Sequence, residues 1–432
     1  MTQPQDFAAP RGVDLDARWL TFLGVVLVAL TLPTLKLPIV VELRIGQLLL
    51  IGGFAWLAMR DLVAGRLHWG LLLGLVGAGL LLCIISYASP YTKVKQVYFF
   101  VKYLFLFPAA FYLSARVVAT ISPARLAATL EWVLLIGCGL AVFLNWFPIP
   151  LLIHERPEGL ATGLKGSFWE QGSFAFFIGL FLVGSLSLRV GYQMWPRQPL
   201  RLALLYVFAL GCAIASLSVT IWLALVLALV TGGLAHHPPE TDRVSGGRAR
   251  RWSLYFLIIA AVAAIALLAY NAWLPVGDKL ITADALQTKW QDERGAALRT
   301  AWKLILEHPW LGHGFGFVEA FFGTRPLGIV GLGSGVAQIF NSYVDVWVSV
   351  GVFGLAYALG MLWLAFDRRV LFCTLVVAYV FVFANINPMA QTEYYHIFLG
   401  AAFALSRWHK GGPKPSWHSR RQRHPNPPLE AV

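Results

Sequence analysis

Apolar runs of about twenty residues recur along this chain, and they limit its possible folds more than any other feature. A helix of that length crosses the hydrocarbon core of a bilayer, which is roughly 30 Å thick. Hydrophobic residues make up 58% of the 432 residues and charged residues only 13%. A soluble domain carries about 25% charged residues, so the sequence predicts an all-α polytopic membrane protein without a large soluble domain.

We expect about twelve transmembrane helices in a single transmembrane domain over residues 19–410. The expected spans are Trp19–Val40, Ile45–Met59, His68–Ala88, Val97–Ala115, Leu126–Phe147, Gly172–Leu188, two between Leu200 and Leu234, Trp252–Tyr270, Ser342–Phe366, Val370–Ala384 and Tyr394–Leu405. The run from Leu200 to Leu234 is too long for one helix, so we divide it near Ser216 and Ser218. As a single helix it would move every later loop to the other side of the membrane.

Basic residues set the expected orientation, because lysine and arginine collect in cytoplasmic loops. Most of the 34 basic residues fall in short segments on one side of the predicted topology, so we expect both termini in the cytoplasm. Residues 1–18 form the N-terminal segment and residues 411–432 a disordered basic tail. The net charge of +13 also fits nucleic-acid binding, but retention of loops at an anionic membrane face is the simpler explanation.

Two further features bear on the compartment. We expect no cleavable signal sequence, because the chain is polar through Arg18 and the first apolar run has no suitably placed small-residue cleavage site. The four cysteines all lie inside apolar runs, which is typical of small buried residues and not of a disulfide set or a metal site.

The longest polar interval is an expected periplasmic loop over residues 271–341, between spans nine and ten. It contains a stretch in which Leu298, Trp302 and Ile305 recur at helical spacing, with Arg294 beginning the same stripe, so we predict an amphipathic helix there. Pro309 is expected to end this helix. The following turn, residues 310–316, has three glycines in five residues, which allow the backbone to come close to another group.

Basic residues in the outward loops break the charge rule and therefore need a reason. They occur in the loop over residues 271–341 and in a second expected periplasmic loop over about residues 148–171. Ion pairs with Glu155, Glu158 or Glu293 are one explanation for any single residue. Arginine also binds phosphate through its planar fork and stays charged at any relevant pH. A pocket with several such groups would suit a lipid-linked pyrophosphate.

The outward segments resemble a known family. Residues 156–159 read Arg-Pro-Glu-Gly and lead to Trp-Glu-Gln-Gly-Ser-Phe at 169–174; later come Asp-x-Arg at 292–294, His-Pro-x-x-Gly-x-Gly-x-Gly at 308–316 and Asn-Ser-Tyr-x-Asp at 341–345. This combination, from Arg156 to Phe366, resembles Wzy-type exopolysaccharide polymerases of the O-antigen ligase and polymerase superfamily, with a xanthan-like system as one possibility. Outside these residues, the chain resembles the family only in its pattern of hydropathy.

The resemblance implies a metal-independent glycosyltransferase of the bacterial inner membrane that needs no cofactor and uses undecaprenyl-pyrophosphate-linked glycans. A flippase and a chain-length regulator of the same pathway are the implied partners; nucleic acid is not. Arg156 and Arg294 match the family arginines expected to hold the donor pyrophosphate, whose departing charge they would stabilise. The full set of expected substrate-binding residues is Arg156, Arg294, Arg299, Lys165, Tyr343 and Asn341.

The general base is not assigned by the resemblance, because ligases carry His-Asn where this chain has Phe340-Asn341. The family's Ser-Arg near the eighth span is likewise altered, to Ser-Val at 218–219. His313 is the first candidate, since an imidazole titrates near neutral pH; Glu170 and Asp345 follow. Each has a structural alternative: a backbone-bonded loop histidine, a carboxylate at a helix N-terminus, and a partner for Arg294 or Arg325.

Three other functions are also compatible with the sequence. The loss of His-Asn favours a polymerase over an O-antigen ligase-like transferase. A flippase for lipid-linked oligosaccharides would also suit twelve spans, but it predicts charged residues at the midplane of several spans. A scaffold for a synthesis complex would tolerate the loss of the outward arginines.

Overall fold

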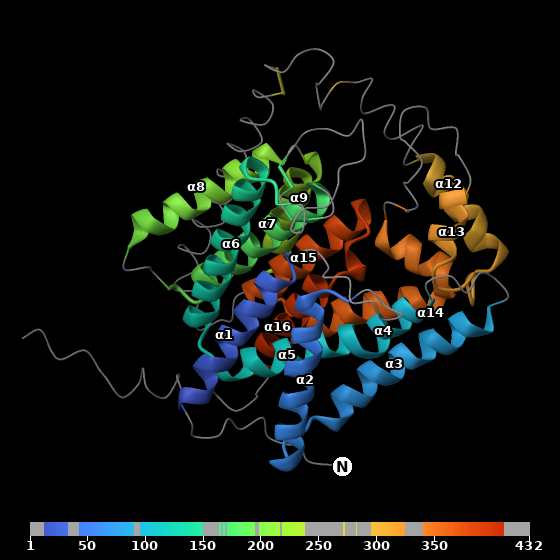
Figure 1. Ribbon diagram of the computed structural model, residues 1–432, viewed down its shortest axis with the longest axis horizontal. Helices are drawn as coiled ribbons and strands as arrows, with labels where there is room; N and C mark the ends of the chain where they lie inside the picture. Colours follow the sequence, from blue (N-terminus) through green and yellow to red (C-terminus); the bar gives the residue numbers. More distant parts are fainter. Residues whose placement is uncertain are drawn as a thin grey trace, which may run out of the picture.

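Regular structure in the described part of the chain is entirely helical (Figure 1). The computed structural model describes residues 13–32, 43–89, 96–149, 164–165, 167–168, 171–194, 198–216, 218–237, 271–272, 282, 295–324, 339 and 341–409. The elements are α1 Val13–Ala29, α2 Ile45–Val63, α3 Trp69–Ala88, α4 Gln96–Val101, the π-helix η1 Lys102–Leu106, α5 Phe107–Thr120, α6 Pro123–Trp146, α7 Gln171–Gly191, α8 Pro199–Ala215, α9 Val219–Ala235, α12 Gly295–Glu307, α13 Phe317–Thr324, α14 Ser342–Ala365, α15 Leu371–Ile386, the 3₁₀ turn η6 Met389–Gln391 and α16 Glu393–His409.

Many of these helices are suited to cross a membrane, as the sequence predicts. Six are long and apolar enough to do so: Ile45–Val63, Trp69–Ala88, Gln96–Thr120, Pro123–Trp146, Gly172–Gly191 and Ser342–Ala365. Shorter apolar helices cover Arg18–Ala29, Pro199–Ala215, Thr220–Ala235 and Leu371–Ile386. The expected span Trp252–Tyr270 lies outside the described residues. The all-helical membrane class is therefore confirmed, while the number twelve stays a prediction.

The division of the long apolar run near Ser216 is confirmed. Helix α8 ends at Ala215 and α9 begins at Val219. The Ser216 hydroxyl donates a hydrogen bond to the carbonyl of Ala213 at 2.7 Å and accepts one from the Ser218 N–H at 3.4 Å. A serine side chain that bonds to nearby backbone competes with the helical ladder, which explains why the chain breaks here.

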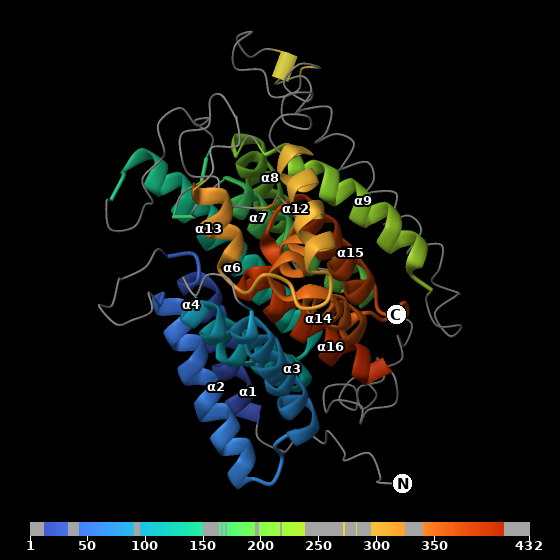
Figure 2. The ribbon, with the colours of Figure 1, turned by 90° about the vertical axis from the view of Figure 1, so that its right-hand side faces the viewer.

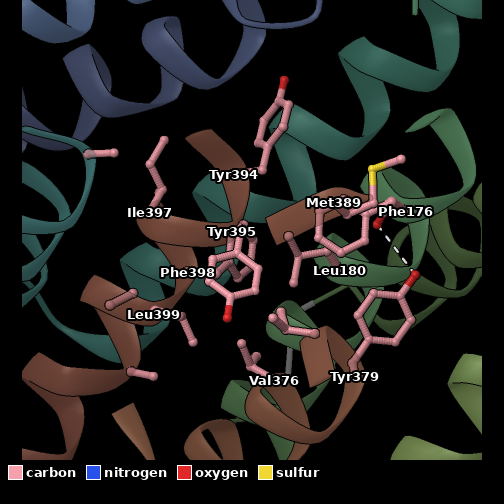
Figure 3. Packing of buried hydrophobic residues seen from close by; sticks show 14 of the residues in the cluster. Phe176, Leu180, Val376, Tyr379, Met389, Tyr394, Tyr395, Ile397, Phe398 and Leu399 are labelled. Carbon is pink, nitrogen blue, oxygen red and sulfur yellow. Dashed lines mark hydrogen bonds between the residues drawn. The ribbon is translucent and has the colours of Figure 1, made fainter. Parts of the chain in front are cut away.

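The core lies where α5, α7, α15 and α16 pack together (Figure 3). Gly400 of α16 faces the carbonyl of Phe111 of α5 so closely that a Cβ atom would lie 3.0 Å from the Phe111 Cα. The Tyr379 hydroxyl donates toward the carbonyl of Phe176 at 3.4 Å, joining α15 to α7. Small residues that let backbones approach, and polar groups that bond across helices, are the usual means of packing in a membrane. All four cysteines are buried.

Polar contacts gather at two opposite ends of the helix bundle. At one end, Arg116 of α5 pairs with Asp61 of α2 at 2.6 Å, and Arg189 of α7 donates two hydrogen bonds of 2.8 Å to Glu131 of α6. The turn between α14 and α15 lies at this same end, which we call the basic end. The carbonyl of Arg368 in this turn accepts from the His237 N–H just beyond α9, and Leu371 packs against Gly191 at the end of α7. These arginines come from segments that the charge pattern assigns to a common side of the membrane; the side itself stays a prediction.

The opposite end, called the loop end, carries the segments expected in the periplasm. It includes the first turn of α14, the turn over residues 310–316 and η6. Ser86 near the end of α3 accepts a hydrogen bond from the Phe315 N–H at 2.8 Å, and Gln47 of α2 donates to Glu393 of α16 at 2.6 Å. Helices α12 and α13 lie together beside α14 at this end (Figures 1 and 2).

The amphipathic helix exists as α12, but the predicted apolar stripe is wrong. Leu298 and Trp302 are 40% and 49% exposed, and only Ile305 of that stripe is buried. The face packed inward carries Ala297, Ala301, Leu304 and Ile305. It joins a small separate cluster with residues of α13 and α14. Two alanines on this face let α12 approach α14 closely, and this decided the rotation of the helix. The end of α12 just before Pro309 is confirmed.

The glycine turn comes close to the backbone of α14, so the prediction of a close approach is confirmed. Gly312, Gly314 and Gly316 have φ values of 65°, 94° and 83°. A Cβ on Gly312 would lie 2.6 Å from the Gly351 nitrogen and 2.7 Å from the Ser349 oxygen. Only glycine adopts such φ values at this separation without strain.

Helix α14 is kinked at the point where the turn contacts it. Val350 and Gly351 leave helical geometry, and Gly351 has a φ of 66°. The Val352 N–H donates to the carbonyl of Pro309 at 3.1 Å, outside its own helix. The carbonyls of Val348 and Ser349, which the kink frees, accept from the His313 and Gly314 N–H groups at 2.8 and 2.7 Å. The turn therefore completes the hydrogen bonding of a broken helix.

Substitution of Gly351 tests this docking. Gly351→Ala should lower the stability of the protein by about 2 kcal/mol or more, through backbone strain and overpacking. A φ of 66° with a ψ of −159° is essentially restricted to glycine and costs another residue about 1–3 kcal/mol, and overpacking adds to that. A Cβ there would also collide with the carbonyl of Trp310. The measurement is the apparent melting temperature of the purified protein in detergent.

Gly360 of the same helix supplies the matched control, because a Cβ there meets nothing within 4 Å. Gly360→Ala should leave the melting temperature unchanged or raise it slightly, since alanine favours a helix over glycine by about 1 kcal/mol. Equal melting temperatures for the two variants would contradict the docking described above.

Candidate functional site

A chain of hydrogen bonds crosses the loop end and joins three segments that are distant in sequence. Lys102 of η1 donates from Nζ to the carbonyl of Gln391 at 3.1 Å. The Gln391 side chain donates from Nε2 to Oδ2 of Asp345 at 2.6 Å. Ionisable residues buried among membrane helices are costly and usually functional, so this chain marks the candidate site.

The π-helix positions Lys102. Single π turns insert an extra residue into a helix and occur frequently at functional sites. Here η1 interrupts an otherwise continuous span between α4 and α5. Gly79 of α3 lies against the carbonyl of Tyr103, where a side chain would not fit. The Lys102 ammonium is half-buried and sits 4.6 Å from the ring centre of Tyr98, which stabilises the cation by a cation–π interaction.

Asp345 lies in the first turn of α14 and is only 7% exposed. Its backbone N–H bonds to the carbonyl of Asn341 at 2.9 Å, and the N-terminus of the helix favours the negative charge of the side chain. Glu319 of α13 and Lys102 are close enough for their charges to act on it. Oδ2 accepts from Gln391, and Oδ1 makes no hydrogen bond with any described residue. The carboxylate therefore has one oxygen that a substrate hydroxyl could use.

The beginning of α14 and the segment around η6 hold each other in place. Asn341 is the N-cap, and its Oδ1 accepts from the N–H groups of Tyr343 and Val344 at 3.0 and 3.1 Å. Ser342 donates to the carbonyl of Asn387 at 2.9 Å and accepts from the Ala390 N–H at 3.0 Å. These bonds fix Asp345 relative to Gln391.

Two of the predicted substrate-binding residues thus lie next to Asp345. Asn341 serves as a helix cap, and its Nδ2 donates to Asn385 of α15 at 3.2 Å. Tyr343 is 6% exposed, its ring centre is 5.5 Å from that of Phe381, and its hydroxyl neighbours that of Tyr395. Both residues support the site, and direct contact with a substrate stays a prediction.

His313 lies inside the docked glycine turn and is 1% exposed. Its Nε2 bonds to the carbonyl of Leu304 at 3.0 Å, so this nitrogen carries the proton. The ring stacks on Phe317 with centres 4.4 Å apart. This geometry is the backbone-bonded arrangement that the sequence analysis held as the alternative to a catalytic base. Burial lowers the pKa of His313 from 6.5, while the bond to Leu304 partly opposes this shift.

The predicted basic residues are placed differently from one another. Arg299 lies on the exposed face of α12. Lys165 is 6% exposed, in a short segment whose Leu164 N–H bonds to the carbonyl of Ala215 at 2.7 Å, beside the break between α8 and α9. Arg156, Arg294 and Glu170 lie outside the described residues, so their grouping with Asp345 stays a prediction.

Sequence reasoning missed Gln391 and Glu319 and left Lys102 without a role. Lys102 had a usable signal, because it is the charged residue inside the expected span Val97–Ala115. Gln391 had none, since a polar residue in a short loop is ordinary. Among the described residues, no group of three His, Cys, Asp or Glu side chains could hold a metal ion.

Comparison with known proteins adds one finding. The family model described as O-antigen ligase matches residues 204–359. The match runs from α8 through α9, α12 and α13 into α14, and so includes the glycine turn, the kink and Asp345. No curated protein matches the chain.

The buried imidazole predicts a pH effect on stability. The pKa of His313 is lower in the folded protein than the ordinary 6.5, so the unfolded chain binds a proton more readily below that pH. Stability should therefore fall as the pH drops below about 6.5, by at most about 1.4 kcal/mol per pH unit for this one group. His313→Gln should reduce the dependence, measured as melting temperatures at pH 7.5 and 5.5.

His237 provides the control, because its side chain is exposed. His237→Gln should keep the acid sensitivity of the original protein. An unchanged pH dependence of the melting temperature in His313→Gln would show that protonation of His313 does not cause the loss of stability in acid.

Proposed function

Because residues 204–359 of this chain belong to the O-antigen ligase and polymerase superfamily, we propose that the protein transfers a glycan from a lipid carrier at the loop end of its helix bundle. Members of this family are membrane enzymes of glycosyltransferase type. In the proposed reaction, the donor is a growing chain on undecaprenyl pyrophosphate and the acceptor is a new lipid-linked repeat unit. The product is exopolysaccharide, made at the periplasmic face of the bacterial inner membrane.

The observation that carries the proposal is the Lys102–Gln391–Asp345 chain beside the expected periplasmic loop. Of its three residues, Asp345 lies inside the family match. Burial of a carboxylate and an ammonium in an apolar bundle is unfavourable, and packing of the helices alone does not require it. The second oxygen of Asp345 bonds to no described residue, so it could accept a hydrogen bond from a substrate. This combination is what a site for proton transfer from a hydroxyl requires.

The chemical step assigns each group a task. The acceptor sugar hydroxyl attacks the anomeric carbon of the donor, the bond from that carbon to the pyrophosphate oxygen breaks, and a glycosidic bond forms. The hydroxyl proton passes to the base, for which Asp345 is our first choice, ahead of His313 and Glu170. Arg156 and Arg294, with Arg299 and Lys165 in support, stabilise the departing pyrophosphate. Neither a metal nor a cofactor is part of the proposed step.

Removal of the proposed base gives the first test of this function. Asp345→Asn keeps the size of the side chain and should reduce polymer formation by about 100-fold or more, because general-base catalysis contributes 10²–10⁴-fold. The assay uses purified protein in liposomes supplied with lipid-linked repeat units, and it scores the ladder of chain lengths. Glu307→Gln, an exposed carboxylate of α12, is the control and should retain the ladder. A normal ladder from Asp345→Asn would remove this residue from the mechanism.

The outward arginines give a separate test. Arg156→Ala or Arg294→Ala should each abolish chain growth while protein level and membrane localisation stay normal, since a pyrophosphate leaving group then lacks its counter-charge. Complementation of a deletion strain, followed by gel analysis of extracted polysaccharide, measures this. A scaffold would tolerate both changes, so full complementation would favour that role.

The match to an O-antigen ligase model favours ligase-like glycan transfer as the second candidate. Deletion of the gene separates the two. The polymerase proposal expects the loss of high-molecular-weight polysaccharide. Long polymer that persists while only its attachment to lipid A core disappears would favour the ligase. Transbilayer movement of the lipid-linked repeat by the reconstituted protein, without chain growth, would favour a flippase.

A further inference from the structure

A pocket of about 330 Å³ opens at the basic end, where α14 passes into α15. Its described lining consists of Trp363, Phe366, Asp367, Arg368 and Arg369. Asp345 lies at the other end of α14, so this pocket is separate from the candidate site. The proposed glycan transfer assigns no role to it.

The position of the pocket at the end of α14 suits the boundary between lipid chains and headgroups. Helix α14 has 24 residues and a kink at Gly351, so its two parts together are at most about 36 Å long, which is enough to reach both boundaries of a bilayer. Trp363 in its last turn is 79% exposed, as is typical of aromatic residues at a membrane interface. Arg368 and Arg369 follow just beyond the helix. The wall formed by Trp363 is thus placed against acyl chains, and the wall formed by Arg368 and Arg369 is placed against headgroups.

None of the charged side chains of the pocket forms an ion pair with a described residue. Arg116 and Arg189 at the same end pair with carboxylates, whereas neither Arg368 nor Arg369 pairs with a described residue. Asp367 is 5% exposed. Its Oδ1 accepts a hydrogen bond from the Arg369 N–H at 3.0 Å, but its Oδ2 is buried without any hydrogen-bond partner. A buried carboxylate oxygen without a donor is unfavourable, so a ligand that supplies a donor would stabilise this turn.

The turn itself is held firmly. The carbonyl of Arg368 accepts from the His237 N–H at 2.8 Å and contacts Nδ1 of His236 at 3.0 Å. The Val370 N–H donates to the carbonyl of Asp367 at 3.1 Å. A preformed turn loses little conformational entropy when a ligand binds.

We propose that this pocket binds a phospholipid with a primary-amine headgroup, the chemistry of phosphatidylethanolamine. The guanidinium groups of Arg368 and Arg369 hold the phosphodiester. The ammonium, two carbons away, donates to Oδ2 of Asp367, and Trp363 with Phe366 contacts the acyl chain. Phosphatidylglycerol offers Asp367 only neutral hydroxyl donors and no ammonium, and a soluble phosphate lacks the acyl chain.

The first experiment compares lipids on the unmodified, full-length protein in detergent by native mass spectrometry. Phosphatidylethanolamine, phosphatidylcholine and phosphatidylglycerol with identical acyl chains are added singly. Phosphatidylcholine has no N–H group, so we expect its apparent affinity to be about tenfold lower, as a lost hydrogen bond to a charged group implies. Equal affinity for these two lipids, or tighter binding of phosphatidylglycerol than of phosphatidylethanolamine, would overturn the proposal.

Variants then assign the preference to this pocket. Asp367→Asn keeps the oxygen that accepts from the Arg369 N–H and should lower the affinity for phosphatidylethanolamine to that for phosphatidylcholine. The double change Arg368→Gln and Arg369→Gln should lower the affinity for both lipids to the same extent. Arg125→Gln, an exposed arginine outside the pocket, is the control and should change neither.

A soluble headgroup separates a lipid site from an ion site. Glycerophosphoethanolamine should displace the bound lipid only at concentrations far above those of the lipid itself, because it lacks the contact with Trp363 and Phe366. Displacement at equal concentration would contradict a lipid site. Retention of the phosphatidylethanolamine preference by a folded Asp367→Asn variant would also contradict it.

Discussion

The hydrogen bonding between the glycine turn and the kinked α14 is the interaction on which the loop end depends. Backbone N–H and C=O groups within a membrane must find partners inside the protein. The kink at Gly351 takes the carbonyls of Val348 and Ser349 out of the helical ladder, and the turn over residues 310–316 supplies their donors. The same contact brings α12 and α13 over the beginning of α14. The turn and the kink therefore supply hydrogen-bond partners to each other.

This docking has a chemical consequence, because Asp345 stands about one and a half turns before the kink. Its helix is capped by Asn341, tied to the η6 segment through Ser342 and covered by α12 and α13. The carboxylate is thereby held against Gln391 and within the influence of Lys102. A polar chain of this kind is preorganised, so a reacting hydroxyl would meet a base already oriented. At the basic end, by contrast, most carboxylates pair directly with arginines.

The candidate site could be predicted from the sequence only in part. Asp345 stands out because a carboxylate inside an apolar run is costly, and the charge of Lys102 inside a span is noticeable for the same reason. Gln391 could not be found, since its role comes from the folding of η6 against α14. His313 was singled out by its titration range, whereas the structure places its ring in a buried bond to the carbonyl of Leu304. Composition cannot reveal which way a loop histidine turns.

Hydrophobicity along the chain determined the helical membrane class, the bounds of most helices and the break near Ser216, because a bilayer imposes both a length and a complete backbone ladder on each span. The three glycines of the turn likewise showed by themselves that a close approach occurs. Only the tertiary structure decided what they approach, and which face of α12 is buried: alanines, and not the larger Leu298 and Trp302, meet α14. The sequence pattern of one helix shows how apolar each face is. The closest packing of two helices depends on the side-chain shapes of both helices.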